Sequence, residues 1–206
     1  MGTGSAGHPA ERMHALAETR PELDFDTVYS STFDFAWRLL RRLGVPESSL
    51  DDAAQDVFIV VHRRLEEFEG RSSPKTWVAG IAVRVAADHR RSARRRGAPV
   101  ELSDELADTR PGPLESVSSL EALRLVQTLL STLDDNQRQV FVLMEMEQLT
   151  ATEVAGIVDA NVNTVYSRLR LARAAFEQAL ALRPDPEVEQ LIVRWLRGHP
   201  ASLAPR

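Results

Sequence analysis

The chain has 206 residues, a formal net charge of −5 at pH 7 and no cysteine. That length accommodates one good hydrophobic core or two small ones. The lack of cysteine excludes disulfides and thiolate metal sites, and it favours a reducing compartment. No apolar run approaches the roughly 20 residues that span a bilayer, and residues 1–20 lack the apolar core of a secretory signal. The composition therefore favours a cytoplasmic protein without membrane insertion.

Three amphipathic helices are expected in the first half of the chain, after a mobile tail at residues 1–22. Apolar residues recur at helical spacing over 24–43 and again over 51–68. Ser73 is the expected N-cap of the third helix, because Pro74 then takes the first helical position, where proline is well tolerated.

Charge is segregated along the chain. Six arginines and one aspartate lie within 84–96, whereas six acidic residues and one arginine lie within 98–121. An acidic chain with basic islands suggests weak general affinity for DNA and a partner that supplies much of the binding.

The helical pattern lapses over 97–118, where prolines and glycines interrupt a polar, acidic stretch, and this is the predicted domain boundary. Helical spacing resumes near Leu120, and Asp134 or Asp135 caps a further helix. Strand-type alternation of useful length is absent from the sequence. The predicted fold class is all-α, with two small helical bundles joined by a flexible acidic linker.

The stretch 149–173 is typical of a helix-turn-helix. Thr150 and Glu153 have the spacing of a capping box for a short first helix, and Asn161 caps a second helix after a very short turn. The second helix turns its apolar residues inward and leaves polar residues and arginines on its other faces, a set suited to phosphates and base edges. The pattern points to DNA, although two short capped helices also occur in helical proteins that never contact it.

Enzymes are the class that the sequence supports least. His62 and Glu66 lie one helical turn apart, but such a pair is more often a solvated face than a catalytic dyad. The histidines fall in tails or unrelated helices without metal-ligand spacing. The sequence has no glycine-rich phosphate loop or nucleophile motif, so we expect no catalytic residue, metal or cofactor.

Motifs in both halves agree in order and spacing with one known family. The first half contains DDAAQDVF at 51–58 and FEGRSSPKTW at 68–77, and the second contains LDDNQRQVF at 133–141 before the helix-turn-helix. Over residues 24–182 the chain resembles the extracytoplasmic-function (ECF) group of bacterial RNA polymerase sigma factors. Such a factor performs no chemistry itself; it gives core polymerase promoter specificity and strand opening.

The resemblance implies a domain organisation and a set of partners. The domains are a tail at 1–22, sigma region 2 at 23–96, a linker at 97–118, sigma region 4 at 119–183 and an extension at 184–206. The partners are core RNA polymerase, through the clamp helices of its largest subunit, promoter DNA and an anti-sigma factor. The alternative is a stand-alone helix-turn-helix regulator, which would leave the first domain without a role.

The resemblance also assigns site residues in the first domain. The polymerase-binding set on the second helix is Asp51, Asp52, Gln55, Asp56 and Phe58. A solvated acidic first turn is the competing interpretation of its carboxylates. The set for the −10 element, in a melting loop and the helix after it, is Arg71, Ser72, Ser73, Lys75, Thr76, Trp77, Arg84, Asp88, Arg90 and Arg91. Small polar residues suit a pocket for a flipped base, and Trp77 either stacks on the strand or belongs mostly to the core.

In the second domain the −35 element is assigned to the second helix of the helix-turn-helix. The set is Asn161, Asn163, Thr164, Tyr166, Ser167, Arg168, Arg170 and Arg173. Because the turn lacks the glycine usual in the family, Asp159 is expected to adopt a left-handed conformation. Tyr166 and Arg84 replace a common lysine and a common asparagine, which implies altered promoter preference. The acidic linker residues, either a nucleic-acid mimic or a plain spacer, are Glu101, Asp104, Glu105 and Asp108.

Overall fold

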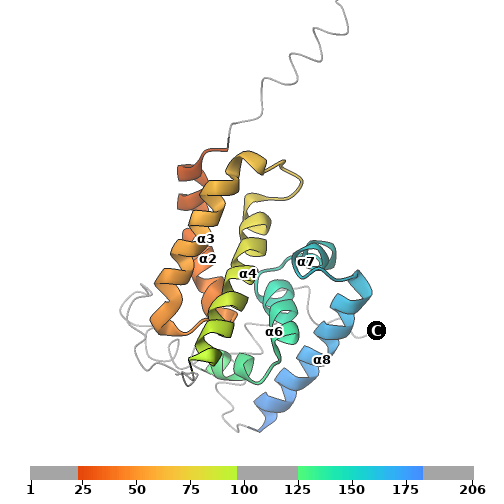
Figure 1. The fold of residues 1–206 in the computed structure, drawn as a ribbon. Helices are drawn as coiled ribbons and strands as arrows, with labels where there is room; N and C mark the ends of the chain where they lie inside the picture. The colour runs from red at the N-terminus through yellow and green to blue at the C-terminus, as the bar shows by residue number, and fades with distance from the viewer. Residues whose placement is uncertain (1–22, 97–124, 183–206) are drawn as a thin grey trace, which may run out of the picture.

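The computed structural model describes residues 23–96 and 125–182 (Figure 1). Within these two ranges the chain forms helices and no strand, in agreement with the predicted all-α class. The expectations for the tail, the acidic linker and the C-terminal extension lie outside the described residues. None of the described helices is long and apolar enough to cross a membrane.

Three helices pack together as the N-terminal bundle: α2 (Phe25–Arg42), α3 (Leu50–Arg64) and α4 (Pro74–Arg95). Each helix contributes one apolar stripe to a common core in which Leu39 and Val57 are fully buried. Burying a side chain of this size contributes roughly 1.5–3 kcal/mol. The buried residues of each stripe are the apolar residues that recur at helical spacing in the sequence. The packing of the bundle therefore follows from the sequence pattern.

Local signals set the ends of these helices. The Asp24 carboxylate accepts the Thr27 N–H at 2.8 Å and caps α2. Gly44 follows that helix with φ +85°, a left-handed geometry that glycine adopts without steric penalty. The sequence pattern predicted that α3 extends to position 68. The helix instead ends at Arg64, because Leu65–Glu67 tightens into a 3-10 turn.

The C-terminal bundle consists of helical residues 125–131 with α6 (Asp135–Phe141), α7 (Ala151–Ile157) and α8 (Val162–Ala181). The Asp134 carboxylate accepts the N–H of Gln137 and caps α6. Helix α8 packs along both α6 and α7, and the Phe141 and Phe176 rings stack with their centroids 4.8 Å apart. The long α8 therefore holds the shorter helices together.

Between α6 and α7 the chain forms a π-helical turn, Val142–Met146, which the periodicity of the sequence did not predict. Its wider winding closes with a hydrogen bond from the Glu147 N–H to the Val142 carbonyl at 3.0 Å. Glu145 and Glu147 are both buried and point to different partners. Glu145 pairs with Arg173 of α8, whereas Glu147 pairs with residues of the N-terminal bundle.

The two bundles pack against each other, a contact that the prediction of two tethered bundles did not include. Figure 1 shows α4 between α2 and α3 on one side and α6 and α7 on the other. Gly80, buried on α4, lies beside the Ile157 side chain of α7. The buried apolar residues consequently form one continuous cluster across both bundles.

Candidate nucleic-acid and polymerase interfaces

The helix-turn-helix begins with a complete capping box. The Thr150 hydroxyl accepts the Glu153 N–H at 3.3 Å, and the Glu153 carboxylate accepts the Thr150 N–H at 2.9 Å. The Thr150 backbone N–H lowers the pKa of Glu153 most, followed by the Thr150 hydroxyl. The capping box predicted from sequence is therefore confirmed, and a charged Glu153 is part of it.

The turn between α7 and α8 has the strain predicted for a turn without glycine. Asp159 has φ +49°, in the left-handed region. The Asn161 side chain then accepts the N–H of Thr164 at 2.8 Å and caps α8. A second left-handed residue, Gln148 with φ +60°, was not predicted. It follows Glu147, the residue that ends the π-helical turn, and the turn itself was not visible in the periodicity.

Helix α8 separates an inward apolar face from an outward polar face. Val165, Leu169 and Ala172 are buried. Tyr166 is 55% exposed, which makes its ring available to a partner. The exposed members of the predicted −35 set are Asn161, Asn163, Tyr166, Ser167 and Arg170, and the half-buried members are Thr164, Arg168 and Arg173.

Arg173 already has a partner inside the C-terminal bundle. Its Nε donates to Glu145 Oε1 at 3.0 Å, and its guanidinium is about one-third exposed. Glu145 is buried, so the pair fixes α8 against the π-helical turn. A phosphate contact by Arg173 would have to compete with this carboxylate.

The loop before α4 presents small polar and cationic side chains. Gly70 turns the chain with φ +68°, and Arg71 next to it is exposed and pairs with Glu69. The Ser73 hydroxyl accepts the Thr76 N–H at 3.0 Å and caps α4 as predicted. Ser73 and Lys75 are exposed, and Ser72 is half-buried. Thr76 is only 6% exposed, which the sequence did not indicate.

Trp77 combines the two interpretations that the sequence allowed. Its ring packs against Phe68 with the centroids 4.9 Å apart, and the residue is half-buried at the edge of the core. The indole therefore packs on the loop at Phe68 and stays partly exposed, and stacking on DNA stays a prediction.

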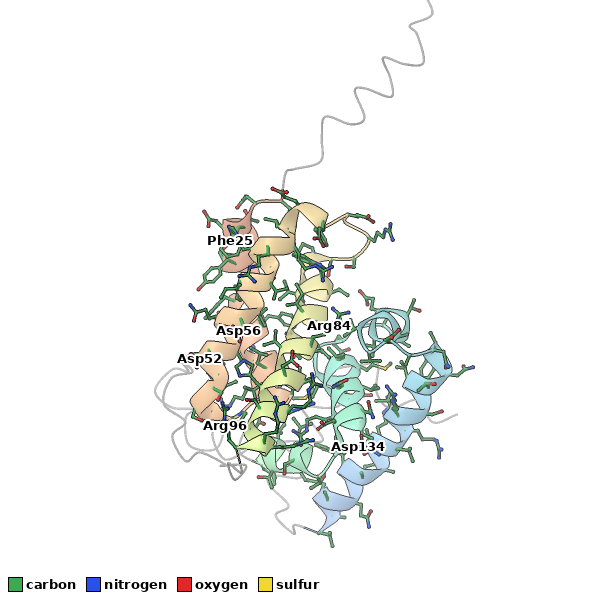
Figure 2. All side chains as sticks on the ribbon, viewed as in Figure 1. Phe25, Asp52, Asp56, Arg84, Arg96 and Asp134 are labelled. Carbon is green, nitrogen blue, oxygen red and sulfur yellow. The ribbon has the colours of Figure 1, made fainter. Side chains whose placement is uncertain are left out.

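Farther along α4 the arginines differ in environment. Arg84, labelled in Figure 2, is exposed and donates to the Gly80 carbonyl at 3.3 Å. Arg91 and Asp88 are exposed and pair with each other within the helix. The neighbouring Arg90 is instead 5% exposed.

Arg90 lies at the junction of the two bundles. It donates to the Leu43 carbonyl and lies 3.3 Å from an Asp135 carboxylate oxygen. Burial lowers the pKa of Arg90, and the Asp135 charge opposes that shift. Within the described residues its Nε has no hydrogen-bond partner. The sequence did contain a signal for this burial, because Arg90 continues the helical stripe of Ala86 and Ala93.

The acidic side chains predicted to bind polymerase lie on the exposed side of α3. Figure 2 shows Asp52 and Asp56 on the side facing away from the C-terminal bundle. Asp51 accepts a hydrogen bond from Trp37 Nε1 at 3.2 Å, and Asp56 lies 2.8 Å from His89 Nε2. Gln55 is exposed with them, which gives this turn of α3 a polar surface.

An apolar hollow lies beside this acidic surface, and the sequence analysis did not identify it. Phe58 is buried at its base, with its ring centroid 4.8 Å from that of Tyr29. Tyr29 and Ile59 are exposed at its wall. The spacing of its three α2 aromatics could have revealed it: Phe25, Tyr29 and Phe33. Within the described ranges no three His, Asp or Glu side chains gather in a way that could hold a metal ion.

Comparisons with known proteins agree with this geometry. The family model of sigma-70 region 2 matches residues 28–96, and that of sigma-70 region 4 matches residues 123–176. The RNA polymerase sigma factor CnrH of Cupriavidus metallidurans is 30% identical over 148 residues, which is 68% of this chain and 78% of CnrH. The ECF RNA polymerase sigma-E factor of Escherichia coli is 31% identical over 142 residues, 65% of this chain and 74% of that factor. The chain therefore belongs to the sigma-70 family of RNA polymerase sigma factors, within its ECF group.

Two solved structures share the fold. The sigma factor RpoE of Bartonella quintana, in complex with the anti-sigma factor NepR, superposes with a TM-score of 0.60 at 19% identity, over 77% of this chain and 97% of RpoE. The structure of CnrH with the cytosolic domain of CnrY gives a TM-score of 0.58 at 22% identity, over 77% of this chain and 88% of CnrH.

Proposed function

We propose that the chain binds core RNA polymerase, reads the −35 and −10 elements of its promoters, and helps to melt the DNA at the −10 element. The observation that carries the proposal is that this member of the family has two different polar surfaces, one in each bundle. Helix α8 presents an exposed polar face, and the α3–α4 loop presents small polar residues beside a half-exposed tryptophan. One surface suits duplex DNA and the other suits an extruded base.

The −35 element is assigned to α8. A helix enters the major groove with the residues of its first turns against base edges. Asn163 and Ser167 are the candidates for hydrogen bonds there, and Arg170 is the candidate for a phosphate or a guanine. Tyr166 supplies an apolar ring for a thymine methyl group. Promoter binding then requires both contacts, that of α8 with the −35 element and that of the N-terminal bundle with the −10 element.

The −10 element is assigned to the loop from Arg71 to Thr76 and to α4. Flipping a base from the duplex costs a few kcal/mol. Stacking on the open edge of Trp77 returns roughly 1–3 kcal/mol for each base. Arg71 and Lys75 hold the flanking phosphates, while Ser72 and Ser73 line the base pocket. Arg84, Asp88 and Arg91 on α4 form the continuation of this surface.

Core polymerase is assigned to the exposed side of α3. The acidic turn from Asp51 to Asp56 suits cationic partners, and the hollow beside it suits an apolar side chain. Buried aromatic anchors surrounded by a polar rim are the usual centre of a protein interface. The clamp helices of the polymerase are the proposed occupant. An anti-sigma factor is a further proposed partner, since both structural neighbours were solved with a regulator of that kind or a cytosolic fragment.

In vitro transcription tests the function. Core polymerase with the purified chain is expected to start transcription at discrete genomic promoters, and core polymerase alone is not. A chain that binds a specific duplex tightly without polymerase, and that fails to bind core, would instead be a stand-alone regulator. That result would overturn the proposal.

A further inference from the structure

Glu145 is a buried carboxylate of the C-terminal bundle that the proposed function does not use. It lies in the π-helical turn between α6 and α7, and its side chain is only 4% exposed. Arg173 of α8 donates to Glu145 Oε1 from Nε at 3.0 Å, and its Nη2 donates to the same oxygen. The pair therefore connects the π-helical turn to the helix assigned to the −35 element.

The π-helical turn is what brings Glu145 into the interior. The Glu147 N–H donates to the Val142 carbonyl, five residues back, at 3.0 Å. One residue inserted into an α-helix rotates every later side chain by about 100° around the axis. Glu145 is consequently buried with its apolar neighbours in the turn, and the Gln148 side chain donates to the Glu145 carbonyl at 2.8 Å. Turns of this kind are frequent at functional sites.

Burial makes the position of Arg173 specific. A carboxylate removed from water is stable only when it is paired and hydrogen-bonded, so Glu145 requires a cation in one place. Two N–H groups of one guanidinium reach one oxygen, which fixes the direction of the Arg173 side chain as well as its distance. Because Arg173 lies 28 positions after Glu145, the pair fixes the rotation of α8 against the rest of its bundle.

The rotation of α8 decides which side chains face a ligand. Seven residues make almost two turns of a helix, so Arg173 lies on the side of α8 that also carries Tyr166. Tyr166 and Arg170 are exposed, whereas the Arg173 side chain is 35% exposed and directed to Glu145. Side chains that bind a ligand must be held within about 10–20° of the productive geometry. A rotation of α8 would therefore misplace every contact with a base edge.

We propose that Glu145 is a positioning residue for the −35 element and that Arg173 acts as its structural partner, not as a DNA contact. The proposal rests on the proposed function, since it takes α8 to read the −35 element. In the alternative, Arg173 leaves Glu145 and binds a phosphate. The two possibilities predict opposite effects of removing the Glu145 charge, because the carboxylate supports DNA binding in one and competes with it in the other.

Promoter binding by the reconstituted holoenzyme distinguishes the two signs. The affinity is measured for a promoter defined by in vitro transcription and for the same promoter with a scrambled −35 element, and the ratio is the −35 preference. E145Q is expected to lower the −35 preference about tenfold, which corresponds to the loss of one base contact. Tighter binding to both promoters by E145Q would show that Arg173 had been released to DNA, and it would overturn the proposal.

E177Q is the matched control, because it removes the same charge from an exposed position of α8. Its −35 preference and its binding to core polymerase are expected to be unchanged. Circular dichroism shows that each variant is folded at the temperature of the assay. A less stable E145Q that keeps the full −35 preference would overturn the positioning role, and so would an equal loss of preference in E177Q.

R173Q tests the other half of the pair and serves if E145Q does not fold. It is expected to lower the −35 preference while leaving unchanged the slope of log affinity against log salt concentration. A residue that contacts a phosphate would instead lower that slope by about 0.9. R170Q, which removes an exposed candidate for such a contact, provides the comparison. A lowered slope in R173Q would overturn its role as a structural partner.

The unchanged chain separates this proposal from the proposed function. A holoenzyme that does not distinguish the two −35 sequences would overturn the assignment of α8, and the role of Glu145 with it. A −35 preference that is present in the unchanged chain and survives in both E145Q and R173Q would overturn the role of Glu145 alone. The proposed function would then stand.

Discussion

The two helices assigned to DNA, α4 and α8, are built from similar patterns but present their polar faces differently. Both are long, capped by a polar side chain and buried along one apolar stripe. The outward face of α8, which includes Tyr166, is exposed to solvent. On α4, by contrast, Thr76 and Arg90 are buried against acidic residues of the C-terminal bundle.

The difference shows that the accessibility of a helix's polar face depends on its tertiary neighbours as well as on its own sequence. An exposed cation on α8 and a covered cation on α4 have the same chemistry. Only the tertiary neighbours decide which is available to a phosphate. Each prediction below alters one side of this comparison.

The largest loss of stability is expected from truncating a buried side chain on the inward face of α8. F176A deletes a buried ring that stacks on Phe141, and such a deletion costs about 3–5 kcal/mol. Urea unfolding followed by circular dichroism measures the loss. Y166A on the exposed face of the same helix is the control, expected to change stability by less than about 0.5 kcal/mol while weakening −35 binding. Equal stability of the two variants would contradict the two-faced description of α8.

The next largest loss of stability is expected at Gly44, which lies after α2 and beside Arg90 of α4 and Arg138 of α6. G44A is expected to destabilise the protein by about 1–3 kcal/mol, because φ at Gly44 is +85° and a Cβ there would lie 2.0 Å from Arg138 Nη1. G156A serves as the control. Apart from its chain neighbours and the backbone of α7, no atom lies within 4 Å of a Cβ at that helical position, so alanine is expected to stabilise α7 by up to about 1 kcal/mol. Thermal unfolding compares them, and a stabilising G44A would contradict the packing described for Arg138.

A smaller loss of stability is expected from removing the capping box of α7, the helix that packs against α8. T150A is expected to cost about 1 kcal/mol, because it removes a hydroxyl that caps the helix. T152A, at an exposed position two residues on, is the control and is expected to be nearly neutral. Chemical unfolding near neutral pH compares the two variants, and equal losses would show that the cap contributes nothing specific.

The same capping box predicts an acid dependence. Hydrogen bonds lower the pKa of Glu153 below its ordinary value of 4.5, so the folded state binds its proton less readily than the unfolded chain does. The stabilising contribution is therefore present above pH 4.5 and is lost as the pH falls through the lowered pKa. Unfolding measured across this range is expected to show a shallower acid slope in E153Q, because this variant has no carboxyl group to titrate at the cap. An unchanged slope would contradict the assigned cause of the shift.

The smallest effect is expected at the turn between α7 and α8. D159G relieves a left-handed φ of +49° and is expected to stabilise the protein by about 0.5 kcal/mol. Removing the same side chain from Asp134 by D134G, where it caps α6, is expected to destabilise instead. Thermal unfolding distinguishes the two signs, and a destabilising D159G would show that the aspartate side chain contributes more than its backbone strain costs.

Most of the local structure could be predicted from the sequence, because it depends on residues a few positions apart. The caps Ser73, Thr150 and Asn161 and the left-handed Asp159 follow from short patterns with a known geometry. The family membership followed in the same way, from motifs that agree in order and spacing across both halves.

The contact between the bundles could not be predicted in this way. The pairing of Glu147 with Arg42 joins distant positions and leaves no period in the sequence. The π-helical turn that positions Glu147 interrupts the expected spacing of the helix. The resemblance implied that Arg90 contacts the −10 DNA together with its exposed arginine neighbours, whereas this residue is buried and pairs with Asp135 from the other bundle.

Footprinting of a promoter defined by in vitro transcription tests the account most directly. With core polymerase, the chain is expected to protect both the −35 and the −10 elements and to make thymines of the −10 element reactive to permanganate. Alone, the chain is expected to give at most weak protection at −35 and no reactivity at −10. Equal protection and melting by the free chain, or melting by the holoenzyme that persists when Lys75, Thr76 and Trp77 are all replaced by alanine, would contradict it.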